Sequence, residues 1–391
     1  MKHRFGLWFL SILLFSNLCA QTITPGANRM EKYLPLLRDR TIAVVANHTS
    51  VVNKKNIVDS LLQLGIKIKV IFSPEHGFRG VADAGEVVNN SIDSVSKLPV
   101  ISLFGNYNKP KKEDLTGVDV IVFDIQDVGV RFYTYISTMH YVMEACAEQN
   151  IPFIVLDRPN PNGYYIDGPV LKPQYKSFVG MDQVPIVYGM TIGEYAKMVN
   201  GEGWLAAGKR CGLTVIECLG YTHASRVDIP IKPSPNLPNA LSIQLYPTLC
   251  LFEGTVVSVG RGTDYPFQVI GHPGMIAKGF TFKPRSIPGI CKTPMFQDQL
   301  CNGIDFRSKR ASPAFEDGKI NLAIISYAYK NTILKEKQQF FNSFFTRLSG
   351  TDELKQQLID NVPETQIRAS WQKDLDNFKT IRSKYLLYKD F

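Results

Sequence analysis

The segment IKIKVIFSPEHG, residues 66–77, decides the fold class of this chain. Its apolar run has the composition of a strand buried on both faces, and it ends in the polar residues Ser73, Glu75 and His76. Strands that are apolar on both faces are typical of parallel sheets covered by helices. The segment therefore predicts an α/β fold with a charged loop at one sheet edge.

The same pattern recurs four more times between residues 41 and 157. Apolar runs that end in polar residues are TIAVVANHTS (41–50), LPVISLFGN (98–106), VDVIVFDIQDVG (118–129) and IPFIVLDRPNP (151–161). Between them, residues 53–65 and 134–150 place apolar side chains at helical spacing. This alternation predicts right-handed crossovers and a doubly wound, mostly parallel sheet.

The residue composition changes after Pro161, where a Pro- and Gly-rich stretch indicates a loop or a crossover between domains. A capping box from Thr191 to Glu194 predicts a helix that ends at Gly201. Strands are expected at 213–221 and 320–329, and helices at 334–347, 351–361 and 364–383. We therefore expect a first domain over residues 21–165 and a second, smaller α/β domain over residues 166–391.

Residues 1–20 have the features of a secretory signal peptide: a basic start, an apolar stretch and the small residue Ala20 before Gln21. A lipoprotein would use Cys19, but Asn17 and Leu18 suit that cleavage poorly. No later apolar run has transmembrane length. We expect an exported protein, secreted or periplasmic, that is soluble and leaves the membrane after signal cleavage.

Removal of the leader would lower the formal charge from +9 to +7. Such a charge suits either a solvated basic surface or anionic partners such as wall polymers. The chain has no block of Lys and Arg and no basic stripe interleaved with aromatic residues, which argues against a nucleic-acid partner.

Several familiar chemistries lack their motifs. No GxGxxG follows the first strand, and neither GxxxxGK[ST] nor GxSxG is present, so nucleotide binding and serine hydrolysis have no support. The cysteines that follow the leader form no CxxC pair, and the histidines are scattered. We therefore expect no cofactor and no metal, and Cys146, set among helix-core residues, is interpreted as a buried thiol.

Carboxylates, by contrast, are abundant where the predicted strands end. They are Glu75, Glu86, Asp124, Asp127 and Asp157. Glycoside hydrolysis uses one carboxylic acid to protonate the leaving oxygen and often a second carboxylate as base or nucleophile. In doubly wound sheets the carboxyl ends of the strands form the ligand edge, which would bring these groups together.

Each of these acids also has a structural interpretation. Asp124 and Asp127 would equally cap the following helix or pair with Arg131. Glu75 is not needed by any obvious helix start, and shielding by Phe72 and Phe78 would help it to keep the proton of a general acid. Glu75 is therefore the leading catalytic candidate.

Arginines accompany the turn-rich segments. Arg79, Arg131, Arg158 and Arg261 carry guanidinium groups that bind carboxylates bidentately, which suits an anionic sugar with a lactyl group. Tyrosines 133, 135 and 265 would stack on a sugar face or serve as ordinary core aromatics.

Five motifs taken together resemble the exo-β-N-acetylmuramidase family (NamZ-like, DUF1343). They are SPEHGFRG, FDIQDVGVRFYTYISTM, VLDRPNP, PSPNLP and LFEGTVVSVGRGTDYPFQVIG, and the likeness runs from about Leu34 to KYLLY near the C-terminus. The resemblance implies a Rossmann-like first domain, a second domain and a cleft between them. It also implies release of N-acetylmuramic acid from the non-reducing end of peptidoglycan fragments, with Glu75 as the catalytic candidate.

The hypothesis from the sequence is thus a metal-independent glycosidase that acts on MurNAc–GlcNAc saccharides in cell-wall recycling. Glu75 is the general acid, and the second carboxylate is sought among Asp124, Asp127 and Glu86. Substrate contacts are expected from His76, Arg79, Arg131, Tyr133, Asp157, Arg158, Asn160, Asn236 and Arg261. The alternative is a non-catalytic muropeptide-binding protein, which would need the arginines and aromatic residues but not the acids.

Overall fold

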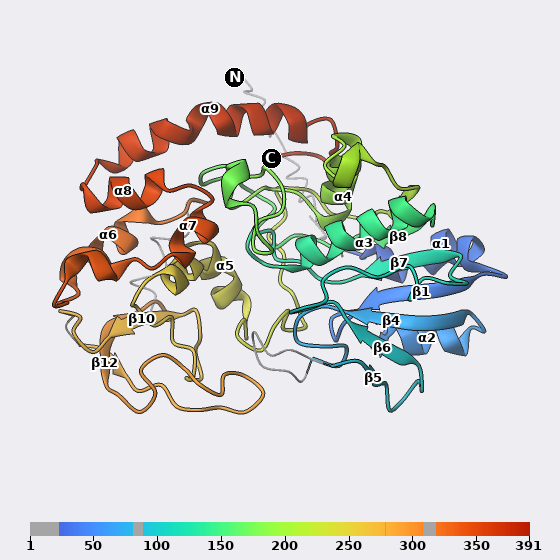
Figure 1. Cartoon of the computed structure of the whole chain (residues 1–391), viewed down its shortest axis with the longest axis horizontal. Helices are drawn as coiled ribbons and strands as arrows, with labels where there is room; N and C mark the ends of the chain where they lie inside the picture. Colours follow the sequence, from blue (N-terminus) through green and yellow to red (C-terminus); the bar gives the residue numbers. More distant parts are fainter. Residues whose placement is uncertain (1–22, 81–88, 278, 308–317) are drawn as a thin grey trace, which may run out of the picture.

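The computed structural model describes residues 23–80, 89–277, 279–307 and 318–391 of the 391-residue chain. The expected leader, residues 1–20, and the candidate acid Glu86 lie outside the described residues. None of the helices in these described ranges combines the length and the apolar composition that a membrane span requires. The described chain forms two halves, one built on a large sheet and the other mostly helical (Figure 1).

A seven-stranded sheet organises the first half, in the order β5-β6-β4-β1-β7-β8-β9. All neighbours are parallel except β5, which runs antiparallel to β6. The strands are β1 (Thr41–Ala46), β4 (Lys67–Ser73), β5 (Ser91–Ile92), β6 (Pro99–Ser102), β7 (Val120–Asp124), β8 (Phe153–Leu156) and β9 (Leu213–Ile216). Apart from β5, this is the order of a Rossmann-like sheet, whose winding reverses between β1 and β7. The predicted doubly wound fold is confirmed.

The strands are apolar on both faces because helices cover both. Val45 and Phe123 face the core that contains Met139 of α3 (Tyr135–Gln149), and α4 (Ile192–Gly201) packs into the same core. Val44, one residue along β1, faces the opposite core with Leu61 of α2 (Ile57–Gln63), which α1 (Met30–Leu37) completes. Neighbouring residues of one strand thus enter different cores, which explains the continuous apolar runs.

Strand β9 corrects the expected position of one element. The predicted strand at 213–221 was assigned to the second domain, but β9 pairs in parallel with β8 and completes the first sheet. The capping box of α4 is present as predicted, with the side chains of Thr191 and Glu194 bonding each other's backbone N–H groups. The large sheet therefore extends past residue 165, because the loop after Pro161 leads back into it rather than out of it.

The second half begins with α5 (Ala240–Leu249) and contains a three-stranded antiparallel sheet in the order β10-β12-β11. Its further elements are β10 (Val269–His272), β11 (Thr281–Phe282), β12 (Cys301–Asp305), α6 (Leu322–Asn331), α7 (Phe344–Ser349), α8 (Glu353–Ile359) and α9 (Glu364–Arg382). Helix α9 runs back from this half towards α4, so that the C-terminus ends against the first half (Figure 1).

Short elements complete the chain. They are the strand pair β2 (Val51–Val52) and β3 (Lys55–Asn56), and the 3₁₀ turns η1 (Gly26–Asn28), η2 (Pro173–Tyr175), η3 (Ala206–Gly208), η4 (Cys250–Gly254) and η6 (Lys337–Phe340). Cys146 is buried, as predicted, and the six cysteines that the structure describes are free thiols.

Two predictions for the second half are wrong. The expected strand at 320–329 is helix α6, because Leu322, Ile325 and Ala328 bury one helical face and the Asn321 side chain caps the first turn. A short apolar run does not distinguish a strand from a buried helix. The expected helix at 334–347 is broken into η6 and α7 by the extended backbone of Phe341.

The two halves share one hydrophobic core. Met139 of α3 and Trp371 of α9 belong to the same buried cluster. Arg131, fully buried, adds a polar connection: its guanidinium donates to the carbonyls of Pro169, Val184 and Leu348, at 2.9, 2.7 and 2.9 Å. Since Leu348 belongs to α7, this side chain fixes the second half onto the first.

Candidate active site

A pocket of about 290 Å³ lies where the loop after β4 meets the segment before α3 and the second half. Both halves line it, which confirms the expected cleft. The lining includes the charged and polar side chains of Glu75, His76, Thr134, Ser234, Asn236, Glu253 and Arg261. Aromatic rings form much of the remaining wall, from Phe104, Phe132, Tyr133, Tyr135, Phe178, Tyr246, Phe267 and Phe344.

Glu75 enters this pocket from a tight turn at the end of β4. His76 and Gly77 both have left-handed backbone, with φ of 71° and 75°, and the N–H of Gly77 donates to the carbonyl of Pro74 at 3.1 Å. A left-handed residue other than glycine is strained, and such strain is concentrated at functional sites. The Thr134 hydroxyl donates to Oε2 of Glu75 at 3.2 Å, which orients the carboxyl group from the α3 side.

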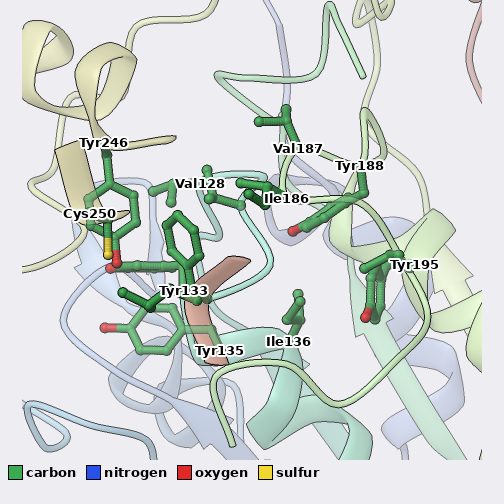
Figure 2. Packing of buried hydrophobic residues seen from close by; sticks show 14 of the residues in the cluster. Val128, Tyr133, Tyr135, Ile136, Ile186, Val187, Tyr188, Tyr195, Tyr246 and Cys250 are labelled. Atoms are coloured by element: carbon green, nitrogen blue, oxygen red, sulfur yellow. The ribbon is translucent and has the colours of Figure 1, made fainter. Parts of the chain in front are cut away.

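Tyr133 and Tyr135 position the loop that follows residue 232. Both hydroxyls donate to the carbonyl of Pro233, at 2.8 and 3.1 Å. This places Asn236 in the pocket wall, where its Nδ2 donates to Ile290 and its buried Oδ1 has no partner among the described residues. Figure 2 shows Tyr133 and Tyr135 opposite Tyr246 and Cys250 of the second half.

An ion pair from the second half completes the charged wall. Nε of Arg261 donates to Oε1 of Glu253 at 2.6 Å, and the guanidinium lies 5.0 Å from the centre of the Phe267 ring. Nη1 of Arg261 is buried and has no hydrogen-bond partner in the described chain. A buried donor without a partner is costly, so this nitrogen is a strong candidate to meet a ligand.

Burial keeps three further groups of this wall neutral. It raises the pKa of Tyr133, Tyr246 and the Cys250 thiol well above their ordinary values. At neutral pH these groups therefore act as hydrogen-bonding partners, and the side chain of Cys250 is not a thiolate nucleophile.

The structure brings together six of the residues singled out from the sequence, which are Glu75, His76, Tyr133, Tyr135, Asn236 and Arg261, whereas Tyr265 does not line the pocket. It adds Glu253, which the sequence interpretation missed although Glu253 lies in the motif LFEG, eight residues before Arg261. The signal that would have found it is a carboxylate next to a Gly-rich segment that also holds a candidate arginine. Glu253 was missed because the candidate acids were sought after the strands of the first half, and Glu253 lies far from them along the chain.

Asp124 and Arg158 do not line the pocket. They form a buried pair, with Nε and Nη2 of Arg158 donating to the two carboxylate oxygens at 2.5 and 2.9 Å. Burial raises the pKa of Asp124, while Arg158 acts in the opposite direction. Instead of serving a ligand, this pair closes the edge of the sheet at β7 and β8.

Asp127 and Asn160 are likewise engaged inside the fold. Oδ2 of Asp127 accepts from the N–H of Gly129 at 2.7 Å and from the Tyr188 hydroxyl. Burial raises the pKa of Asp127 to about 6. Asn160 donates to the carbonyl of Met190 at 2.7 Å, and a Cβ at Gly129 would lie 2.1 Å from its Oδ1, so the two loops pack in direct contact.

Asp157 joins the end of β8 to the start of α4 and to the C-terminal segment. It accepts from the hydroxyls of Tyr388 and Thr191, at 2.5 and 2.7 Å, and from the N–H of Gly193 at 2.8 Å. Burial is the main reason that its pKa is raised to about 7. These contacts assign Asp157 to folding rather than to substrate binding.

Arg79 and Arg131 are also occupied elsewhere. Arg79 pairs with Asp93 and Asp59, at 2.8 and 3.1 Å, and Arg131 binds the three carbonyls already described. Phe72 and Phe78, expected to shield Glu75, belong to the two buried cores, and Phe104 and Phe178 line the pocket in their place. Among the residues that the structure describes, no group of three or more His, Cys, Asp or Glu could hold a metal ion.

A pocket with two carboxylates, an arginine and an aromatic wall suits the cleavage of a glycosidic bond. The aromatic rings offer stacking surfaces for a sugar, and the acids offer a proton donor and a second carboxylate. On this fold and this pocket, the class of protein is a two-part α/β glycoside hydrolase.

Comparison with known proteins agrees with this class and narrows it. Residues 42–241 match the family model described as exo-beta-N-acetylmuramidase NamZ, N-terminal, and residues 244–388 match its C-terminal counterpart. The chain is 38% identical to peptidoglycan beta-N-acetylmuramidase NamZ of Bacillus subtilis (strain 168), over 99% of this chain and 100% of that protein. The chain belongs to the NamZ exo-β-N-acetylmuramidase family.

Two solved structures share the whole architecture. Both are DUF1343 family proteins from Bacteroides fragilis NCTC 9343. One is 45% identical with a TM-score of 0.87, covering 95% of this chain and all of that one, and the other is 30% identical with a TM-score of 0.77, covering 94% and 99%. The family models divide the chain between residues 241 and 244, which agrees with β9 belonging to the first sheet.

Proposed function

We propose that this protein cleaves N-acetylmuramic acid from the non-reducing ends of peptidoglycan fragments, with MurNAc–GlcNAc as the smallest natural substrate. The observation that carries the proposal is one pocket that contains Glu75, Glu253 and the unpartnered Nη1 of Arg261. Its volume of about 290 Å³ is near the lower end for ligand pockets. A pocket of this size suits one terminal sugar, as an exo-acting enzyme requires.

Glu75 is the general acid in this proposal. It donates its proton to the bridging oxygen while the bond from that oxygen to C1 of the terminal sugar breaks. Glu253 is the second carboxylate: it either takes a proton from the attacking water or attacks C1 itself. The 2.6 Å hydrogen bond from Arg261 orients Glu253 for that step.

Arg261 also explains a preference for an acidic sugar. Its Nη1 would donate to the lactyl carboxylate, a charge-assisted bond that satisfies the buried donor. Oδ1 of Asn236 would accept from a sugar hydroxyl or from the acetamido N–H. Of these two contacts, the one from Arg261 distinguishes N-acetylmuramic acid from a sugar without the lactyl group.

The place of action follows from the leader predicted at residues 1–20. A secreted or periplasmic enzyme would meet wall fragments during their turnover and recycling. Localisation of a full-length fusion by cell fractionation tests this part of the proposal. Retention of the fusion in the cytoplasm would contradict it.

The main test replaces Glu75 with Gln, which keeps the shape of the side chain and removes its proton. Activity on purified MurNAc–GlcNAc is followed by mass analysis of the products, and kcat should fall by about 10²-fold or more. Glu31→Gln, the same change at an exposed acid on α1, is the matched control. Full activity of the Glu75 variant would exclude this residue as the acid.

The same experiment tests the rival function. A non-catalytic muropeptide-binding protein would bind the disaccharide without releasing either sugar. Calorimetric binding together with unchanged substrate mass would favour that rival. Release of free N-acetylmuramic acid by the wild-type protein excludes it.

A further inference from the structure

A second cavity, of about 730 Å³, adjoins the catalytic pocket. It is lined by the segment from Ser102 to Asp114 together with Asn89 and Asn90. Phe104 lines both cavities, so the two spaces meet at one aromatic ring. The ring centres of Phe104 and Phe178 lie 6.0 Å apart, which secures the Phe104 ring on the side of the first pocket.

Strand pairing sets the second cavity beside Glu75. Ser102, at the end of β6, pairs in register with Ser73, at the end of β4. Glu75 follows Ser73 by two residues and lines the first pocket. The turn that carries Glu75 therefore begins beside the strand end that carries Ser102.

The second cavity is built for hydrogen bonding. The hydroxyl of Ser102 is buried, with only 4% of the residue exposed, and it has no partner in the described chain. Oδ1 of Asn90 accepts from the N–H of Ser102 at 3.1 Å, which fixes one amide beside that hydroxyl. Asn106 adds a second, exposed amide. A buried hydroxyl without a partner points to a ligand that supplies one.

Aromatic surface and charge identify the kind of ligand. Tyr107 is held by a hydrogen bond to Asp114, with the Lys111 ammonium 4.8 Å from its ring centre. The first pocket offers an acidic group the buried, unpartnered Nη1 of Arg261, whereas Lys111 in the second cavity lies over the Tyr107 ring beside the acids Glu113 and Asp114. An acidic sugar fits the first pocket, and an uncharged, hydroxyl-rich sugar fits the second.

We propose that the second cavity binds the leaving group, an uncharged acetamido sugar on the reducing-end side of the cleaved bond. This inference rests on the proposed function, because it assigns the first pocket to the terminal acidic sugar. Ser102 and Asn106 bind the departing sugar, and Phe104 separates the two rings. When Glu75 protonates the bridging oxygen, that oxygen leaves with this sugar as its new hydroxyl.

The test compares two substrates in Ser102→Ala and Asn106→Ala. One is MurNAc–GlcNAc, and the other is the 4-nitrophenyl β-glycoside of N-acetylmuramic acid, whose leaving group has no sugar hydroxyl or acetamido group. The measured quantity is the ratio of kcat/KM for the disaccharide to kcat/KM for the aryl glycoside. Each variant should lower this ratio by about 3- to 10-fold, the effect of one lost hydrogen bond.

The control variant is Gln366→Ala, an exposed residue of α9 that should keep the wild-type ratio. An unchanged ratio in both cavity variants, with wild-type turnover of both substrates, overturns this inference and leaves the proposed function standing. Absence of wild-type turnover on both substrates overturns the proposed function and this inference with it. Melting temperatures of all variants exclude loss of folding as the cause.

Discussion

Two ion pairs between a carboxylate and an arginine show how burial distinguishes a structural pair from one that can bind a ligand. Asp124 and Arg158 form a pair at the carboxyl edge of the sheet, with side chains 0% and 7% exposed. Glu253 and Arg261 form a pair in the pocket, with side chains 24% and 25% exposed. The chemical groups are the same, and only the second pair can meet a ligand.

Hydrogen-bond satisfaction separates the two pairs further. Arg158 contacts both oxygens of Asp124 and reaches the carbonyl of Val51 at 3.3 Å. Arg261 binds Glu253 through Nε alone and keeps Nη1 without a partner in the described residues. The pair of Asp124 and Arg158 only connects loops of the fold, whereas the pair of Glu253 and Arg261 keeps a hydrogen-bond donor available for a ligand. Loss of either partner should therefore affect stability in the first case and activity in the second.

The largest expected effect is on stability. Asp124→Asn would leave the Arg158 charge buried without its partner, which should lower the free energy of unfolding by about 3–5 kcal/mol. Urea unfolding followed by circular dichroism measures the loss. The same change in the open pair, Glu253→Gln, should cost only about 1 kcal/mol. Equal losses would remove the distinction between the two pairs.

Activity should show the reverse order. Glu253→Gln keeps the fold but removes the second carboxylate, and kcat on MurNAc–GlcNAc should fall by about 10²-fold or more. Release of N-acetylmuramic acid, followed by mass analysis under saturating substrate, gives the rate. If the variant keeps more than a tenth of the wild-type kcat, Glu253 is not the second carboxylate and its pair with Arg261 only shapes the pocket.

Asp127 extends the comparison to a buried acid whose hydrogen-bond partners, Gly129 and Tyr188, are uncharged. Because burial raises its pKa from 3.8 to about 6, the folded state holds more protons than the unfolded state in this range. The contribution of Asp127 to the free energy of unfolding should therefore be complete below about pH 4, and it should be lost as the pH rises through about 6.

Asp127→Asn keeps an acceptor for Gly129 and Tyr188 and removes the titration. The fall in unfolding free energy between pH 4 and pH 7 should shrink by about 1–3 kcal/mol relative to wild type, at roughly 1.4 kcal/mol per pKa unit. Urea titrations at both pH values measure the difference. An identical pH dependence in the two proteins would show that the pKa of Asp127 is the same in the folded and unfolded states.

The smallest expected effect concerns selectivity. Arg261→Met removes the donor proposed for the lactyl carboxylate, so kcat/KM for a MurNAc glycoside should fall about tenfold more than for its neutral lactyl-amide derivative. Comparing the two substrates cancels any general loss caused by the freed Glu253. A parallel fall on both substrates would assign Arg261 to holding Glu253 rather than to recognising the acid.

The sequence predicted the first half well because its signals are local. Apolar runs buried on both faces revealed the parallel strands, and the capping box at Thr191 and Glu194 marked a helix start. The turn that contains Glu75 was predicted because charged residues follow directly after an apolar strand, which is a pattern that the local sequence shows. The prediction was wrong for residues 320–329, where burial of one helical face and of one strand face leaves the same short apolar run.

The candidate site was predicted only in part, and the reason is distance along the chain. Asp124 and Arg158 occupy strand ends just as Glu75 does, but their mutual contact closes that place to any ligand. Glu253 lies 178 residues after Glu75 and reaches the same pocket only because the second half packs onto the first. Neither outcome is visible in residue type or spacing.

By itself, the sequence determined the doubly wound sheet, the charged turn at Glu75 and the membership of a family, because periodicity and short motifs are properties of neighbouring residues. Only the tertiary structure decided which acids are sealed and which are open, since burial and pairing depend on what other segments bring to the same place. The pocket exists because Tyr133 and Tyr135, at the start of α3, hold the Pro233 carbonyl and because Arg131 ties α7 to the first half. Those contacts join residues about 100 and 217 positions apart, a separation over which local patterns carry no information.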